Sequence, residues 1–574
     1  MAQEKTCKQC RTQFIVTDED LEFIKKVSPE ISGKVFQFPL PALCYHCRER
    51  KRLLWRNDRY IYKRKNDKDG KEVISIYSPD KKDVKVWANS DWRKDNWDPI
   101  DFGRDYDLSR GFFEQFGELL HKVPRQATNS TMVENCEFCN HVWKSKNCYL
   151  CFNVGPAENC SYCSEAWYVK DCVDCLYIKN CEYCYSAYDS NDCHNCSYIE
   201  HCKNCSESYF AFDCIGCNNV FLSSGLRNKS YYIENRPYPK EEYFKKVEDY
   251  DASISLGVEK CRRKFNELKL KTIRKENNNV MTENCTGDYL IQCKDCKECY
   301  CCHTSINCQR VTDVDGDARD CRDSDFITDV EACYESTSVA GFKNHFCVWI
   351  AYGHDNLYCN FCENSSNCFG CVGLNHKEYC ILNKQYSKEQ YEKLVEKIIE
   401  KMKADGEWGE FFPMELSYFC FNESVANLFF PSSKEEAEKL GANWQDNMFE
   451  PHFEGESYQP KDSIEDYVSN DDEREKLLAG VLKCETTGRP YKIIPQELAY
   501  YLEHKIPVPR VHSDVRYKEL FRLRNPRKLY HRQCMCGETG HGHSGKCPVE
   551  FETTYAPDRP EKVFCEKCYQ ESVA

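Results

Sequence analysis

Long apolar runs are absent from this sequence of 574 residues. No stretch approaches the roughly 18 consecutive apolar residues that a membrane-spanning helix requires. The first residues also lack the apolar core of a signal peptide. These absences predict a soluble, cytoplasmic protein without a membrane partner, in a compartment that keeps thiols reduced.

Positive charge is in deficit. Lys and Arg together number 79 against 93 for Asp and Glu, which gives a formal net charge of −14. A net negative chain is a poor general binder of nucleic acid. Two local basic runs, residues 48–64 and 516–532, contain Tyr or Trp, so ribosome or nucleic-acid binding through them is an alternative. A solvated helix that joins two small domains explains both runs equally well.

Motifs of the common enzyme classes are missing too. The chain has no phosphate-binding loop, nucleophile elbow or zinc-protease helix motif. We therefore expect no enzymatic activity. What the chain has in excess is cysteine, with 43 residues. In a reducing compartment this favours metal ligation, or cysteine as a small core residue, over a disulfide framework.

Two CxxC pairs near the start predict a zinc site. The pairs are Cys7 with Cys10 and Cys44 with Cys47. Zinc binds four soft ligands at tetrahedral corners, and each CxxC turn presents two thiolates. We predict a zinc ribbon in which all four ligand positions are filled by protein, so the expected zinc is structural.

The end of the chain holds more ligands than one zinc ion needs. Residues 56–62 match residues 524–530, and the match continues further along, so we infer that a ribbon-like unit is duplicated. This alignment selects as ligands Cys534, Cys547, Cys565 and Cys568. An inserted loop holds the possible alternate ligands Cys536, His541 and His543. We expect about two structural zinc ions in all.

Two further ribbon-like units lack metal ligands. The inner N-terminal copy carries, at the four ligand positions, Asn66, Asp69, Trp87 and Ser90. A fourth unit keeps only Cys484 and His512. We predict that both are degenerate ribbons that hold their shape by packing.

These ends resemble uncharacterised cysteine-rich proteins of small-genome uncultured bacteria, in which paired ribbons flank a cysteine-repeat middle. The resemblance rests on residues 75–80 (SIYSPD), 97–99 (WDP), 103–105 (GRD) and 555–561 (YAPDRPE). It implies that family members often carry cysteine at the positions of Asn66, Asp69, Trp87 and Ser90. It implies no established activity.

The segment from Cys136 to Cys217 is a repeat. Its eight CxxC motifs begin at residues 136, 148, 160, 172, 181, 193, 202 and 214, so successive motifs are 12 or nine residues apart. In the same phase, every third residue is small or aliphatic, and neither a helix nor an ordinary strand has that period. A tight parallel β-solenoid has it, if each 12-residue coil turns one residue inward on each of four short sides. A nine-residue coil would drop one side.

The turns of this solenoid have a sequence signal of their own. Asn, Asp or His precedes the first cysteine of every motif, as at Asn135 and Asn147. Asn and Asp tolerate tight turns and can stack as ladders between coils. The packing resembles that of the narrow β-helix of beetle antifreeze proteins.

A second cysteine array follows a helical insert. From Cys296 its predicted coil starts are Cys308, Cys321, Cys333, Cys347, Cys359, Cys368 and Cys380, with loops at two phase slips. In this array one column of inward positions holds Ser324, Ser336 and Ile350. These residues are poor zinc ligands.

Three roles are open for the array cysteines. Stacked coils would place those of the first array in two adjacent columns of eight thiols. The thiols can be small core atoms in a narrow coil, CxxC pairs on successive coils can close four-sulfur metal sites, or disulfides can form. The possible ligands are Cys136, Cys139, Cys148, Cys151, Cys160, Cys163, Cys172, Cys175, Cys181, Cys184, Cys193, Cys196, Cys202, Cys205, Cys214 and Cys217.

The predicted fold is mainly β, with two tight parallel β-solenoid arrays of about 12 residues per coil, flanked by duplicated zinc-ribbon-like units and interrupted by helical inserts. The predicted segments are a metal-bound zinc ribbon (1–60), a degenerate ribbon plus helix (61–128), array one (129–235), a helical insert (236–284), array two (285–385), a helical segment (386–445), an acidic linker (446–475), a degenerate ribbon (476–525) and a metal-bound zinc ribbon (526–574).

For function, we expect a non-enzymatic zinc-binding protein that acts as a structural scaffold or macromolecular interaction module, with a protein partner or self-assembly. One alternative is thiolate-based metal storage, or an iron–sulfur relay, along the cysteine columns. The other is ribosome or nucleic-acid binding through the basic segments that link the ribbons.

Overall fold

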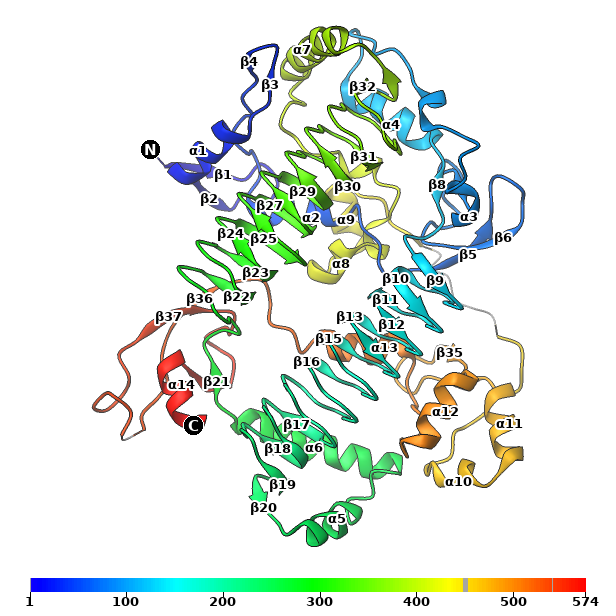
Figure 1. The fold of residues 1–574 in the computed structure, drawn as a ribbon, viewed down its shortest axis with the longest axis vertical. Helices are drawn as coiled ribbons and strands as arrows, with labels where there is room; N and C mark the ends of the chain where they lie inside the picture. Colours follow the sequence, from blue (N-terminus) through cyan, green and yellow to red (C-terminus); the bar gives the residue numbers. More distant parts are fainter. Residues whose placement is uncertain (1, 447–452, 539, 574) are drawn as a thin grey trace. The chain divides into compact units, whose positions relative to one another are not determined.

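The computed structural model describes residues 2–446, 453–538 and 540–573, and it is mostly strand with interspersed helices (Figure 1). It divides into two compact units. Unit 1 comprises residues 1–128, 277–448 and 527–529, and unit 2 comprises residues 129–276, 449–526 and 530–574. Array two belongs to unit 1 and array one to unit 2.

The N-terminal part of unit 1 is built from small hairpins and helices. Thr17 begins the first helix with a capping box, because its side chain accepts from the Asp20 backbone N–H and Asp20 reaches back to the Thr17 N–H. The elements are β1 (Gln3–Thr6), β2 (Gln13–Val16), α1 (Asp18–Val27), β3 (Glu30–Ile31), β4 (Lys34–Val35), α2 (Tyr45–Leu53), β5 (Tyr62–Lys65), β6 (Glu72–Ser75), β7 (Val86–Trp87), α3 (Asn89–Trp92), α4 (Phe112–Lys122) and β8 (Arg125–Gln126).

Array two is a 10-stranded parallel sheet in which each strand pairs with the equivalent strand of a neighbouring coil. Gly287 lies opposite Cys299, at the coil length that the sequence predicted. The offset is one residue longer where Gln309 faces Arg322, and one residue shorter where Val280 faces Ile291 and where Thr337 faces Val348, so the pairing shifts at three places. The strands are β22 (Gly287–Ile291), β23 (Cys299–His303), β24 (Ser305–Ile306), β25 (Gln309–Val314), β26 (Ala318–Arg319), β27 (Arg322–Ile327), β28 (Val330–Glu331), β29 (Tyr334–Phe342), β30 (Val348–His354) and β31 (Asn360–Glu363).

An aromatic layer packs against the outer side of array two. Phe346 and Tyr358, which occupy equivalent positions on successive coils, stack with ring centroids 5.0 Å apart. Phe116 of α4 stacks on Phe412 at 4.6 Å, and both join the same core as Phe346. The remaining elements of unit 1 are β32 (Cys380–Ile381), β33 (Lys384–Gln385), α7 (Lys388–Asp405), α8 (Val425–Phe429) and α9 (Lys434–Lys439).

Array one in unit 2 has the same parallel pairing, in an 8-stranded sheet and a 4-stranded one whose last two strands pair antiparallel. Phe152 lies opposite Ser164, and Ser164 lies opposite Leu176. The strands are β9 (Thr131–Glu134), β10 (Asn140–Lys146), β11 (Phe152–Val154), β12 (Ala157–Glu158), β13 (Ser164–Trp167), β14 (Val169–Lys170), β15 (Leu176–Lys179), β16 (Tyr188–Asn191), β17 (Tyr209–Phe212), β18 (Asn218–Ser224), β19 (Ser230–Ile233) and β20 (Arg236–Pro237).

Every third residue of array one is buried, in the phase that the repeat predicted. The buried positions run from Cys139 through Val142 and Ser145 to Ser223. They form one narrow core of Cys, Val, Ala, Ile and Ser side chains. Larger side chains lie outside it, as in the pair Tyr198 and Phe210, whose rings stack at 4.5 Å.

The backbone turns a corner once every three residues. From Met132 to Asn228, every third residue except Pro156 has a positive φ between 43° and 67°. Asn and Asp adopt this conformation at lower cost than most residues. At the predicted turn positions, Asn147 Nδ2 donates to Asn159 Oδ1 at 3.0 Å, and further pairs continue the ladder between coils.

The pairing offset in array one stays constant even where successive CxxC motifs are closer together. Across the short step from Cys172 to Cys181, Val173 still pairs with Tyr185. The prediction of nine-residue coils is therefore wrong. A constant offset of 12 keeps backbone N–H and C=O groups paired across the short step, as in the 2.9 Å bond from the Val173 N–H to the Cys184 carbonyl.

The predicted two columns of eight thiols are wrong for the same reason. Because the pairing offset is constant, each nine-residue step moves the CxxC motif to the neighbouring side of the coil. The cysteines fall into four shorter columns: Cys136, Cys148, Cys160, Cys172, Cys184 and Cys196; Cys139, Cys151, Cys163 and Cys175; Cys181, Cys193, Cys205 and Cys217; and Cys202 and Cys214.

The rest of unit 2 surrounds array one with helices and small hairpins. The predicted acidic linker, residues 446–475, contains a short helix and the first residues of another, and Tyr467 in it is fully buried; its residues 447–452 lie outside the described residues. The elements are α5 (Lys240–Glu248), α6 (Ser255–Lys271), β21 (Arg274–Lys275), α10 (Glu465–Val468), α11 (Asp471–Ala479), β34 (Leu482–Lys483), β35 (Pro490–Tyr491), α12 (Pro495–Glu503), α13 (Ser513–Phe521), β36 (Tyr530–Gln533), β37 (Glu550–Thr553), β38 (Val563–Phe564) and α14 (Glu566–Val573).

None of the helices in the described ranges combines the length and the apolar character that a membrane-spanning segment requires.

Candidate metal centres

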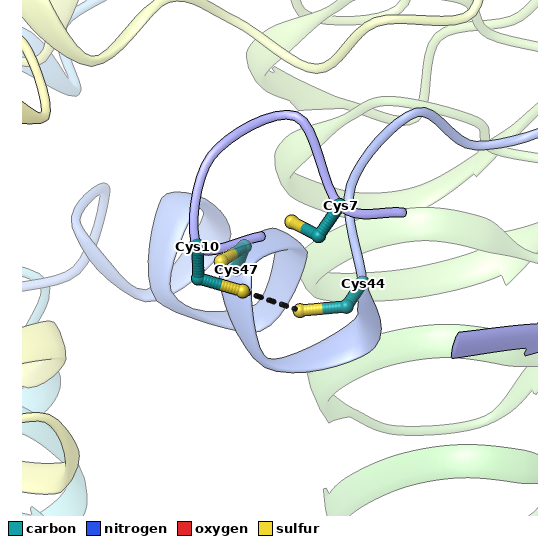
Figure 2. Close-up of side chains that lie close together, drawn as sticks. All are labelled: Cys7, Cys10, Cys44 and Cys47. Carbon is teal, nitrogen blue, oxygen red and sulfur yellow. Dashed lines mark hydrogen bonds between the residues drawn. The ribbon is translucent and has the colours of Figure 1, made fainter. Parts of the chain in front are cut away.

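The first four-cysteine group, the N-terminal tetrad, lies between a hairpin turn and the start of a helix. Cys7 and Cys10 lie in the turn between β1 and β2, and Cys44 and Cys47 lie at the beginning of α2 (Figure 2). All four Sγ atoms lie within 4.8 Å of one another. The Sγ atoms of Cys10 and Cys44 are 3.5 Å apart.

Local structure explains why these thiols converge. In the turn, the Cys7 N–H donates to the Thr12 carbonyl and the Arg11 N–H donates to the Cys7 carbonyl. Cys44 is the N-cap of α2 and makes no side-chain capping bond, so its sulfur is free to face the other three. A helix N-terminus also favours a thiolate. The hydrogen bond from the Cys47 thiol lowers the pKa of Cys44 to about 4.

The second group, the C-terminal tetrad, has the same plan in unit 2. Cys534 and Cys547 flank the paired strands β36 and β37, and Cys565 and Cys568 begin α14. All four sulfurs lie within 4.8 Å of one another and are buried. The Cys565 N–H donates to Cys534 Sγ at 3.2 Å, a bond that favours the thiolate.

Four soft ligands in one small space can hold a metal ion. Each tetrad would fill all positions of a tetrahedral ion with protein sulfur and would leave none for water or substrate. This arrangement suits a structural metal and is unsuited to metal-assisted catalysis.

The possible alternate ligands lie beside the C-terminal tetrad. Cys536, His541 and His543 form, together with Cys568, a further group whose ligand atoms lie within 4.8 Å of one another. Cys568 therefore belongs to two groups at once.

The two predicted metal-free units fold without a ligand cluster among the residues described. At the position of a ligand pair, Asn66 Nδ2 donates to Asp69 Oδ1 at 2.8 Å and to Asp91 Oδ2 at 3.2 Å. The Asn66 turn has the same backbone hydrogen bonds as the Cys7 turn. The N–H of residue i donates to the carbonyl of residue i+5, and the N–H of residue i+4 donates to the carbonyl of residue i. Polar contacts thus hold this turn, where we expected packing alone.

Trp87 and Ser90 also lie outside any ligand cluster found in the described part of the chain. The Trp87 ring packs on Trp97 at 5.0 Å, and the Lys68 ammonium lies 4.6 Å from its centroid. In the fourth unit, the turn at Cys484 has the same hydrogen bonds, and His512 Nδ1 accepts from the Asp514 N–H at 3.0 Å.

Apart from Cys301, which lies at a corner, the array cysteines line or adjoin the cores of their arrays and form no disulfide. Among the residues that the structure describes, none of them belongs to a group of three or more ligand atoms within 4.8 Å. The thiol of Cys163 lies 3.4 Å from the Cys172 carbonyl oxygen in the next coil, and most array cysteines make the same contact. Burial raises the pKa of Cys302 to about 12.

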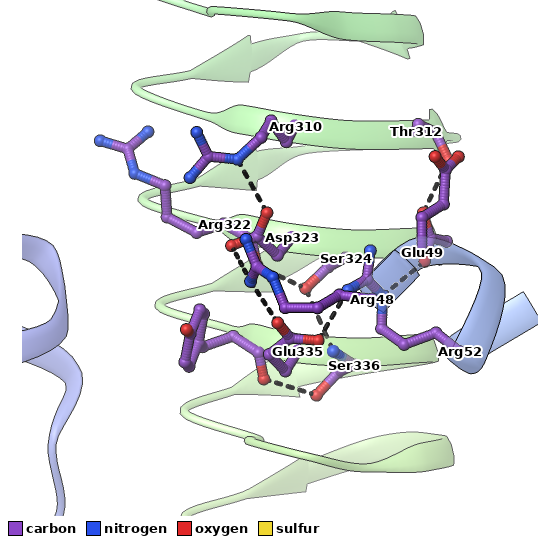
Figure 3. Close-up of polar contacts among 12 residues, drawn as sticks. Arg48, Glu49, Arg52, Arg310, Thr312, Arg322, Asp323, Ser324, Glu335 and Ser336 are labelled. Carbon is purple, nitrogen blue, oxygen red and sulfur yellow. Dashed lines mark hydrogen bonds and ion pairs between the residues drawn. The ribbon is translucent and has the colours of Figure 1, made fainter. Parts of the chain in front are cut away.

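A network of buried ion pairs attaches α2 to array two (Figure 3). Arg52 Nε lies 2.7 Å from Asp325 Oδ2, and Arg52 Nη1 lies 2.6 Å from Glu335 Oε2. Arg48 Nη1 lies 2.7 Å from Asp323 Oδ2 and also pairs with Glu335. The carboxylates come from β27 and β29. Burial opposes the charge of Asp323, but Arg310 and Arg48 hold its pKa well below the usual range.

This network differs from the solvated helix that was one explanation of the first basic run. Arg48, Arg52 and Arg56 are buried, as are Arg516 and Arg527 of the second run. Arg516 Nε lies 2.7 Å from Oδ2 of Asp174, a residue of array one. Paired and buried guanidinium groups are not available to phosphates. The sequence signal that could have revealed the network is the spacing of Arg48 and Arg52, which places both on one helix face, together with acidic residues at array positions that do not point inward.

A smaller polar cluster attaches α14 to the end of array one. Arg227 Nη2 donates to the Tyr569 hydroxyl at 2.7 Å, and the Tyr569 hydroxyl donates to the Asp213 carboxylate. Arg227 Nη2 also lies 2.9 Å from Asp213 Oδ1. Tyr569 directly follows Cys568 in the sequence.

Comparisons with known proteins assign this chain to no family. No protein-family model matches the chain, and a search of curated proteins gave no significant match. One solved structure, named as a putative acetyltransferase from Desulfovibrio desulfuricans G20, is 8% identical over 49% of this chain and 81% of its own chain, with a TM-score of 0.10. So weak a likeness carries no argument about fold or activity.

Proposed function

We propose that the chain is a non-enzymatic scaffold in which zinc at the two tetrads holds one helix onto each of two β-solenoid arrays. One feature common to both units supports this proposal. In each unit, the last two cysteines of the tetrad begin a helix, and residues that directly follow them contact the array of that unit.

In unit 1 the metal ligand and the residue that contacts the array lie on the same turn of α2. Cys47 is directly followed by Arg48, whose guanidinium pairs with Asp323 of β27. A bound ion would fix the N-terminus of α2 through Cys44 and Cys47, and so the position from which Arg48 and Arg52 extend. Without the ion, the burial of these arginines would have to position the helix alone, against a substantial desolvation cost.

In unit 2 the arrangement is equivalent, with different residues. Cys568 is directly followed by Tyr569, which contacts Asp213 and Arg227 at the end of array one. The adjoining strand β38 pairs in parallel with β21, the strand after α6. A metal ion at this tetrad would therefore hold both α14 and β38 next to the array.

In this proposal the arrays are the scaffold proper, and a protein partner or a second copy would bind the parts of their outer faces that the flanking segments leave uncovered. The cysteines inside the coils act as small core atoms, since most of their thiols donate to carbonyl oxygens of the next coil, as Cys163 does to Cys172. A reducing compartment suits so many free thiols. The equivalent turns at Cys7, Asn66 and Cys484 fit descent of the ribbon-like units from one duplicated ancestor.

Metal analysis of variants of the full chain tests the proposal. The variants Cys47→Ser and Cys565→Ser should each lose one zinc ion. Each should also have a lower Tm for the unit concerned, because zinc binding stabilises only the folded ribbon. Cys420→Ser in unit 1 and Cys261→Ser in unit 2 are matched controls, since both replace buried cysteines outside the tetrads and arrays. Unchanged zinc content in Cys47→Ser and Cys565→Ser would refute the proposal.

A further inference from the structure

The loop between Cys536 and Cys547 brings three additional ligands to the C-terminal tetrad. His541 Nδ1 lies 3.1 Å from Cys536 Sγ, and His543 Nε2 lies 3.4 Å from Cys568 Sγ. Cys536 and Cys568 are buried, and the His541 side chain is only 13% exposed. Two thiols and two imidazoles form one of the common ligand sets of zinc.

The conformation of the loop explains how the imidazoles reach the sulfurs. The Cys547 N–H donates to the Cys536 carbonyl at 2.9 Å, which closes the loop at its base. Gly540 and Gly545 have φ of 99° and 72°, which side-chain-bearing residues adopt at a cost, and they form the turns. His543 Nδ1 lies 2.8 Å from the Gly545 carbonyl oxygen. That bond places the proton on Nδ1 and leaves the Nε2 lone pair directed at Cys568, an arrangement typical of metal-ligating histidine.

We propose that the C-terminal tetrad is one half of a two-metal centre in which Cys568 Sγ bridges two zinc ions. One ion would take Cys534, Cys547, Cys565 and Cys568, and the other would take Cys536, His541, His543 and Cys568. This inference rests on the proposed function, because it assumes that the C-terminal tetrad binds zinc.

Both the geometry and the charge favour sharing of Cys568. It is the one residue common to both groups, and within each group all ligand atoms lie within 4.8 Å. A thiolate has enough lone pairs to bind two ions. Four thiolates around one divalent ion leave an excess of negative charge in a buried site. Five thiolates and two neutral imidazoles come closer to balancing two divalent ions, so the second ion lowers the electrostatic cost of burial.

Native mass spectrometry of the full chain after purification in zinc tests the ion count. We expect the double variant His541→Ala/His543→Ala to carry one zinc ion fewer than wild type. The control is His531→Ala in the same hairpin, whose side chain is 68% exposed and pairs with Glu550; it should keep the wild-type count. Equal counts in wild type and the double variant would overturn the two-metal centre, whether the second group is empty or one ion alternates between groups.

The same measurement separates this inference from the proposed function. If the double variant carries as many zinc ions as wild type but Cys565→Ser still loses an ion, only the second ion is disproved. If Cys565→Ser loses none, the zinc site of the proposed function is disproved as well.

Cobalt substitution tests the bridge itself. Two high-spin cobalt(II) ions that share a thiolate are magnetically coupled, so the electron paramagnetic resonance signal of the first ion should weaken as the second binds. In His541→Ala/His543→Ala the uncoupled signal should persist at full cobalt loading. The N-terminal tetrad adds a constant uncoupled signal, so simple addition of three signals in the wild type would show that Cys568 does not bridge.

Discussion

Arg52 and Asp325 form an ion pair with no exposure to solvent: Arg52 Nε lies 2.7 Å from Asp325 Oδ2, and both side chains have a relative exposure of 0%. The pair joins α2, which begins at the N-terminal tetrad, to β27 of array two. Breaking one side of a buried pair leaves a charge without a partner and costs about 3–5 kcal/mol. The pair therefore couples the candidate metal site to the array.

Replacing Arg52 by Met should lower the free energy of unfolding of unit 1 by about 3–5 kcal/mol, because Asp325 would lose its ion-pair partner and Glu335 would keep only Arg48. Urea denaturation monitored by circular dichroism would measure the loss. Lys63→Met is the matched control, since Lys63 pairs with Glu72 on the surface and should cost less than about 1 kcal/mol. A cost for Arg52→Met as small as that of the control would contradict the coupling.

The phase of array one predicts opposite outcomes for two adjacent residues. Val169 is 3% exposed and points into the coil, so Val169→Asp should bury an unpaired carboxylate and destabilise unit 2 by about 3–5 kcal/mol. Tyr168 is 56% exposed and has a φ of 57°, which Asp tolerates, so Tyr168→Asp should change stability little. Thermal unfolding of the two variants compares them, and similar losses in both would reject the inward assignment.

The array cysteines should act by packing. Cys160→Ala with Cys163→Ala should leave the zinc content of the full chain unchanged and should cost about 1–2 kcal/mol per residue, because each change removes one buried sulfur. Elemental analysis and denaturant unfolding would provide the two readings. A loss of metal in this double variant would instead assign ligation to the array and revive metal storage or relay.

His345 should make stability fall in acid. Burial lowers the pKa of His345 to about 3, whereas an unfolded histidine titrates near 6.5. Between these values the unfolded state binds the proton and the folded state does not, so stability is full above about pH 6.5 and falls by about 1.4 kcal/mol per pH unit below it. His345→Phe, beside Phe38, should remove this slope. His354→Gln, at an exposed position, should keep it.

The pH dependence of stability would be measured from the urea midpoints of wild type, His345→Phe and His354→Gln at several pH values. Identical slopes for wild type and His345→Phe between pH 6.5 and pH 4 would show that another group controls acid unfolding.

Short-range sequence signals predicted much of this structure. The CxxC spacing at Cys7 and Cys44 predicted a cluster that the fold brings together, because each pair lies on one tight turn or helix start. The period of three predicted burial at Val154 and Ala187, since corner geometry repeats locally. The Asn147–Asn159 ladder followed from the turn preference of Asn.

Long-range features were less accessible. The distance from Cys172 to Cys181 suggested a nine-residue coil, yet the register is set by backbone pairing between coils, which the spacing of cysteines does not report. The burial of Arg48 and Arg52 depends on carboxylates of β27 that lie far away in the sequence. A net basic run looks solvated until its partners are known.

Hydrogen–deuterium exchange on the full chain, with zinc bound and after removal of zinc by a chelator, tests most directly whether metal holds the helices on the arrays. We expect removal of zinc to abolish amide protection in α2 and α14 and to reduce it in β27 and β29, while the central strands β11 and β13 of array one stay protected. Unchanged protection of α2 and α14 in protein shown to be free of zinc would contradict the account.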